Sequence, residues 1–103
     1  MCIRDSLREF LLDFGDGAAS IAREIATASA QTQAQDAGLL AHKLKSSARA
    51  VGALVLGDRC ELIEQAGKAG DNRAVAELLA DFDRELAAVQ AYIDQNWDRK
   101  ASN

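Results

Sequence analysis

Apolar residues recur at helical spacing in five segments of this chain. The first predicts a short helix over residues 7–14, because its apolar side chains follow the i, i+3, i+4, i+7 order of one helical face. These side chains are Leu7, Phe10, Leu11 and Phe14. Ser6 can cap this helix, since Glu9 completes a capping box with it. Gly15-Asp16-Gly17 then predicts a break in the helix.

The segment after this break predicts a second helix, which Asp16 caps and which runs to about residue 30. Its apolar stripe consists of Ile21, Ile25 and Ala28. The polar stretch QTQAQD that follows indicates a connection or a frayed turn. A third helix is expected over about residues 34–51, and Gly52 ends or bends it.

A fourth helix is predicted from about residue 54 to residue 66, with Leu56, Cys60 and Ile63 facing inward. In the stretch GKAGD, two glycines, Gly67 and Gly70, form a turn, and Asp71 caps the next helix. The last helix has the longest apolar face, about seven turns or 35–40 Å. That face is formed by Val75, Leu78, Leu79, Phe82, Leu86, Val89, Ile93 and Trp97.

The connections between the four longer helices are short, so neighbouring helices should be antiparallel. The expected fold class is all-α, an up-and-down antiparallel four-helix bundle with a short additional N-terminal helix. Residues 1–6 join no periodic pattern and are interpreted as a leader or non-native remnant. The bundle then covers residues 7–97, and residues 98–103 form a C-terminal tail.

The composition supports a single folded domain. The chain has 103 residues, 49% of them hydrophobic and 27% charged, and it contains no proline. Its formal net charge of −4 argues against a nucleic-acid partner, because a duplex binder needs a basic face for the phosphates. No apolar run approaches the roughly 18 residues of a membrane span, and no secretory signal is visible. We therefore expect a cytoplasmic protein without membrane insertion.

Two cysteines, Cys2 and Cys60, lie far apart in the sequence. Two thiols provide neither a disulfide framework nor a zinc site, so both are expected to be reduced.

The only histidine, His42, lies in the third helix. At 100° per residue, the apolar stripe of that helix falls almost opposite to it, so the imidazole should face solvent. That stripe consists of Leu40, Leu44, Ser47 and Val51. The face that carries the histidine is polar and cationic and contains several small residues. Its residues are Gln35, Gly38, Leu39, Lys45, Ser46, Arg49 and Ala53.

Several roles for a lone histidine compete. A metal site needs further ligands at helical spacing, but position 39 is leucine and no second histidine exists. A Ser-His-Asp hydrolase needs a nucleophile elbow or pocket that this helix does not supply. An exposed imidazole near Lys45 and Arg49 suits phosphoryl transfer, because neutral imidazole is a nucleophile and cations stabilise an anionic group on it. Small residues one turn away, Gly38 and Ser46, let another protein's active site close over the ring.

The motifs around this histidine resemble the histidine-containing phosphotransfer (HPt) domain of bacterial multistep phosphorelays. The matching segments are AHKLKSSARAVGA, Leu56, CELIE and GKAGD, and the resemblance covers about residues 7–93. It implies that His42 accepts a phosphoryl group from a receiver-domain aspartate and passes it to another receiver. The partners it implies are receiver domains of response regulators or hybrid sensor kinases.

The resemblance also implies roles for the neighbouring residues. Lys45 corresponds to a phosphate-stabilising lysine, and Lys43, about 100° from the histidine, would serve docking. The partner-docking surface would further include Gly38, Leu39, Ser46 and Arg49, and Ser46 departs from the glycine common at that position. Gly52 would serve the bend after the third helix, while Cys60 and Glu64 look structural, as a core residue and a helix-surface acid.

The chain has no nucleotide loop, no acidic cluster for magnesium beside the histidine and no kinase signature, so it should not phosphorylate itself. No cofactor is expected in this domain, and Mg²⁺ is expected in the partner receiver. One alternative is a helical interaction module without phosphoryl transfer. Another, the dimerisation helix pair of a sensor kinase, is less favoured because Lys43 stands where an acid usually follows the histidine. With its apolar stripes covered, the bundle is expected to be a monomer.

Overall fold

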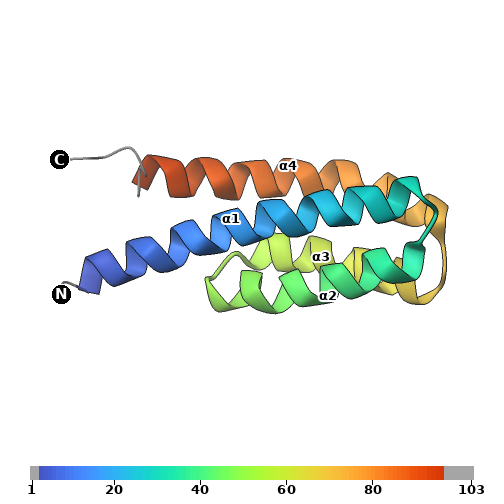
Figure 1. The fold of residues 1–103 in the computed structure, drawn as a ribbon, viewed down its shortest axis with the longest axis horizontal. Coiled ribbons are helices and arrows are strands. Elements are labelled where there is room, and N and C mark those ends of the chain that lie inside the picture. The colour runs from blue at the N-terminus through green and yellow to red at the C-terminus, as the bar shows by residue number, and fades with distance from the viewer. Residues whose placement is uncertain (1–2, 97–103) are drawn as a thin grey trace.

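The computed structural model describes residues 3–96, with side chains from residue 8 onward, as four α-helices. They are α1 (Ile3–Ala30), α2 (Ala34–Ala50), α3 (Leu54–Lys68) and α4 (Asn72–Asn96). Each helix packs against the next in the chain, and α1 and α4 pack together to close the bundle (Figure 1). The prediction of an all-α four-helix bundle is confirmed.

The predicted short N-terminal helix is not separate, because residues 7–14 and 16–30 belong to the single helix α1. Gly15 lies inside this helix and is buried against α4, where Gln90 Nε2 donates a hydrogen bond to its carbonyl oxygen at 2.7 Å. Each helical glycine costs about 1 kcal/mol relative to alanine, and packing along the whole bundle offsets this cost. Asp16 is therefore an exposed residue within a helix and not a cap.

The N-terminal boundary also differs from the prediction. Because α1 begins at Ile3, the proposed capping box of Ser6 and Glu9 does not mark a helix start. Residues 3–6, interpreted as part of a leader or remnant, are helical, and their origin stays a prediction. Residues 1–2, Trp97 and the predicted tail 98–103 lie outside the described residues.

The turns on both sides of α3 follow the sequence closely. Gly52, with φ 86°, joins α2 to α3, and Gly70, with φ 69°, follows the end of α3. These left-handed conformations favour glycine because it has no Cβ. Asp71 Oδ1 accepts a hydrogen bond from the Ala74 amide at 3.0 Å and so caps α4, as predicted. The prediction that Gly67 belongs to this turn is wrong, because it lies inside α3, which continues to Lys68.

The core runs along the bundle axis. The three residues of α3 predicted to face inward, Leu56, Cys60 and Ile63, are all fully buried. In α4 the predicted stripe supplies Val75, Phe82, Leu86 and Ile93 as buried residues, with Leu78, Leu79 and Val89 partly buried.

Phe10, expected in the core face of the first helix, is instead 52% exposed. Phe10 belongs to the first part of α1. The start of α1 and the end of α4 extend beyond the shorter α2–α3 hairpin (Figure 1), which leaves fewer neighbours to cover that part of the bundle.

The buried face of α2 is made mostly of alanine, not of the predicted leucine and valine stripe. Its buried residues are Ala34, Ala37, Gly38, Ala41, Leu44 and Ala48. Leu40 and Val51 are only partly buried, and Ser47 is exposed. Small side chains let α3 approach α2 closely. On the helical wheel these buried residues lie nearer to His42 than the predicted stripe does, so His42 lies at the edge of the α2–α3 interface and not opposite the core.

Candidate functional site

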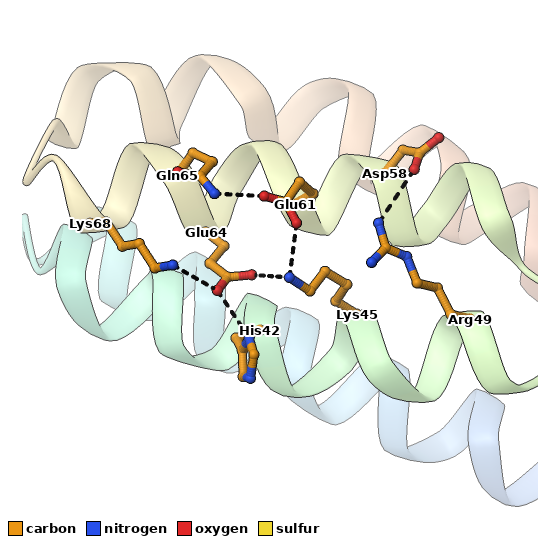
Figure 2. A network of polar contacts seen from close by, with 8 residues as sticks. All are labelled: His42, Lys45, Arg49, Asp58, Glu61, Glu64, Gln65 and Lys68. Atoms are coloured by element: carbon orange, nitrogen blue, oxygen red, sulfur yellow. Dashed lines mark hydrogen bonds and ion pairs between the residues drawn. The ribbon is translucent and has the colours of Figure 1, made fainter.

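His42 is exposed, as the helical wheel predicted, but one edge of its ring is held by α3. Its side chain is 59% exposed, and Nδ1 lies 2.9 Å from Oε2 of Glu64. An ionised carboxylate can only accept hydrogen bonds, so Nδ1 carries the proton of the neutral ring. The lone pair of the neutral ring is then on Nε2, at the end of the ring that points away from Glu64 and α3 (Figure 2).

Glu64 is the centre of the polar network beside the histidine. Its side chain is only 7% exposed, yet its two oxygens meet cations from two helices. Lys45 Nζ lies 2.6 Å from Oε1, and Lys68 Nζ lies 3.4 Å from Oε2. The hydrogen bond from Lys45, supported by the one from His42 and opposed by burial, lowers the pKa of the Glu64 carboxyl to about 2. Glu64 is therefore anionic at neutral pH.

Lys45 reaches across to α3 and not out to solvent. Its Nζ also contacts Glu61 Oε1 at 2.8 Å, and its side chain is 14% exposed (Figure 2). Hydrogen bonds to Glu61 and Glu64 raise the pKa of Lys45. The bond from Lys45, together with one from Gln65 Nε2 at 2.6 Å, lowers the pKa of Glu61. Two carboxylates and one ammonium thus tie α2 to α3 beside the histidine.

A groove of about 500 Å³ lies beside the imidazole, between α2 and α3. Its lining residues are Gln35, Gly38, Leu39, His42, Glu64, Gly67 and Lys68. Leu39 is 70% exposed at its rim, whereas Gly38 is buried in its floor.

The remaining residues predicted for docking lie outside this groove. Lys43 and Ser46 are exposed on α2, and Arg49 faces Asp58 of α3 across 3.6 Å. The structure therefore joins Gly38 and Leu39 to His42 in one groove, and Lys45 to His42 through Glu64.

The prediction that Glu64 is a helix-surface acid is wrong, whereas that of Cys60 as a core residue is confirmed. The sequence did contain a signal. With Cys60 at zero on the helical wheel of α3, Ile63 falls at about 300°, Gly67 at about 340° and Glu64 at about 40°. An acid within a buried stripe needs a charged or hydrogen-bonding partner from another element.

Other reactive groups do not join this network. Burial raises the pKa of the Cys60 thiol to about 12, so it is neither a thiolate nor a nucleophile at neutral pH. Among the described residues, no group of three or more His, Cys, Asp or Glu side chains is arranged to hold a metal ion.

The comparison with protein families agrees with this geometry. The family model of the Hpt domain matches residues 5–92. The chain belongs to the Hpt domain family. No match was found among curated proteins or among solved structures. Membership implies the role of a histidine carrier in phosphorelays and interaction with receiver domains. Within residues 3–96 of this Hpt domain, no helix is long and apolar enough to cross a membrane.

Proposed function

We propose that His42 of this Hpt domain accepts a phosphoryl group from the aspartyl phosphate of one receiver domain and passes it to the aspartate of another. One observation carries the proposal: the imidazole is exposed on one side and held by a buried carboxylate on the other. Glu64 keeps the proton on Nδ1, so the lone pair of Nε2 faces the side from which a partner can approach.

The proposed transfer needs no proton movement. The Nε2 lone pair attacks the phosphorus atom, the bond from phosphorus to the aspartate oxygen breaks, and the receiver regains its carboxylate. The phosphorylated ring keeps its Nδ1 proton and carries positive charge, which the carboxylate of Glu64 stabilises as the acid of a catalytic triad does for its imidazolium. Transfer to the second receiver reverses these steps. The receivers would supply Mg²⁺ and their own acidic pocket.

We further propose that Lys45 stabilises the phosphorylated state through Glu64. Its ammonium lies on two carboxylates and is mostly buried, so it fixes the carboxylate that holds the imidazole. Lys43 and Lys68 are more exposed, and Lys68 lines the groove beside the ring. Both supply positive charge near an incoming phosphoryl group.

The docking surface of the receiver is proposed to be the groove beside His42 together with the neighbouring exposed face of α2. Leu39 provides an exposed apolar contact at the rim, and Gly38 lines the groove without a side chain that would fill it. Ser46, one turn after the histidine, is exposed, so its hydroxymethyl group does not pack in the core. Arg49 extends the basic face by one further turn. An apolar contact surrounded by cations fits an acidic receiver pocket.

The test is to mix the purified chain with a phosphorylated receiver and Mg²⁺ and to follow phosphate on the protein. We expect an acid-labile, base-stable phosphate on the wild type and none on His42→Gln, with unchanged helicity by circular dichroism. Ser47→Gln, an exposed position on the same helix outside the groove, is the matched control and should be labelled normally. Label that persists on His42→Gln would refute the assignment. A wild type that several receivers fail to label would favour an interaction module without phosphoryl transfer.

A further inference from the structure

Two glycines form a close backbone contact between α2 and α3. Gly38 lies one turn before His42, and Gly67 lies one turn after Glu64, and both are buried. A Cβ on Gly67 would be 2.6 Å from the Cα of Gly38 and 2.6 Å from the carbonyl oxygen of Ala34. A Cβ on Gly38 would be 3.0 Å from the Cα of Gly67. These neighbours are backbone atoms, which cannot turn aside as the end of a side chain can.

The local backbone does not explain why glycine is at position 67. Among the described glycines, only Gly52 and Gly70 have positive φ. Gly67 is helical, and glycine there costs about 1 kcal/mol relative to alanine. Its contribution to this fold is therefore the close approach of α3 to α2.

We infer that the contact between Gly38 and Gly67 positions the acceptor histidine, because it sets the helix spacing at which Glu64 reaches Nδ1 of His42. This inference rests on the proposed role of His42 and names two positioning residues for it. Neither glycine touches the reacting atoms. They act through the 2.9 Å hydrogen bond that selects the nitrogen left free for phosphorylation.

The expected effect of Gly67→Ala follows from the distances. The closest contacts, at 2.6 Å, cannot persist, and relaxing them to 3.4 Å, the lower end of ordinary van der Waals contact, separates the helices locally by about 0.8 Å. An equal shift at Glu64 would stretch its bond to His42 from 2.9 Å to about 3.7 Å, which is no longer a hydrogen bond. Lys45 has a long side chain and can follow the carboxylate, whereas the short side chain of His42 cannot.

The tautomer of His42 in the unphosphorylated protein tests this inference directly. Nitrogen-15 NMR of the imidazole at a pH where the ring is neutral should show Nδ1–H in the wild type and mainly Nε2–H in Gly67→Ala. The matched control is Gly57→Ala, a buried glycine of the same helix whose added Cβ would have side-chain atoms of Arg49 as its nearest neighbours, the closest at 3.0 Å. That side chain can move, so the control should keep the wild-type tautomer.

A folded Gly67→Ala variant that keeps the Nδ1–H tautomer would overturn the inference. If that variant fails to fold, Gly38→Ala is measured instead; its contact of 3.0 Å requires a smaller separation, so a partial rise of the Nε2–H tautomer is expected, and no rise would overturn the inference. The rate of phosphoryl transfer is measured beside the tautomer and should fall about tenfold with it, the effect of losing roughly 1.4 kcal/mol of orienting interaction. A wild type that holds the Nδ1–H tautomer but is never phosphorylated would refute the proposed function and leave the positioning intact.

Discussion

The α2–α3 pair and the α1–α4 pair of this Hpt domain are both antiparallel helix pairs, but different interactions hold them together. Between α2 and α3 the backbones nearly touch at Gly38 and Gly67, and ion pairs cross the edge of the interface. The α1–α4 pair contributes larger apolar side chains to the core, such as Phe14 and Ile93. One side-chain hydrogen bond described between these two helices runs from Gln90 to the backbone of Gly15.

This difference indicates that the two helix pairs contribute to different properties of the protein. Large apolar side chains contribute most to the free energy of folding, because each buries much surface. Small residues bury little, but they bring charged side chains of two helices within hydrogen-bond distance. The long helices therefore act as the scaffold, and the short pair carries the proposed acceptor site. Substitutions in the two pairs should then affect different measurements.

The largest effect on stability is expected from Phe82→Ala in the scaffold. Phe82 is fully buried in α4, and truncating a buried phenylalanine costs about 3–5 kcal/mol of unfolding free energy. Urea denaturation measures this loss. The rate of phosphoryl transfer per folded molecule should stay close to the wild-type value, because the network around His42 lies on α2 and α3. If transfer falls by more than the unfolded fraction accounts for, then stability and phosphoryl transfer do not depend on different helix pairs.

The largest effect on transfer, apart from loss of the acceptor itself, is expected from Glu64→Gln. The amide has nearly the same shape, but it does not hold the Nδ1 proton as a carboxylate does or stabilise the positive ring. We expect the transfer rate to fall about tenfold or more, and stability to fall less than in Phe82→Ala. Glu77→Gln, an exposed acid of α4 that faces Arg73, is the control and should transfer normally. An unchanged rate in Glu64→Gln would remove the carboxylate from the mechanism.

The same variant shows how Lys45 acts. If Lys45 works through Glu64, then Lys45→Gln should slow transfer in the wild type but add little in the Glu64→Gln background. If it contacts the phosphoryl group directly, the two losses should multiply.

The features predicted correctly from the sequence are those fixed locally. Gly52 and Gly70 lie where the chain takes a left-handed conformation, and Asp71 caps the helix that follows it. Such signals depend on a few consecutive residues, so both ends of α2 and α3 and the start of α4 were predicted to within about two residues. The exposure of His42 also follows from one helix alone.

The features that were missed depend on a second helix. The sequence around Gly15 favours a break, but α4 covers this glycine and keeps α1 continuous. In the same way, Glu64 has its role only because α2 brings His42 and Lys45 to it. A helical wheel places Glu64 in the buried stripe, but it does not say which cation will meet it. That pairing depends on the rotation and spacing of two helices, which here depend on alanine and glycine.

The smallest predicted effect is a change in how stability depends on acid pH, and it tests whether the network contributes to folding at all. The pKa of Glu64 is lowered from 4.5 to about 2 in the folded state, so its ionisation stabilises the fold above pH 4.5. This contribution is lost progressively as the pH falls from 4.5 toward 2. Urea denaturation at a series of pH values should therefore show a shallower acid decline for Glu64→Gln than for the wild type, because glutamine cannot titrate. Parallel curves would mean that Glu64 serves the histidine without stabilising the α2–α3 pair, and the separation between scaffold and site would then be sharper still.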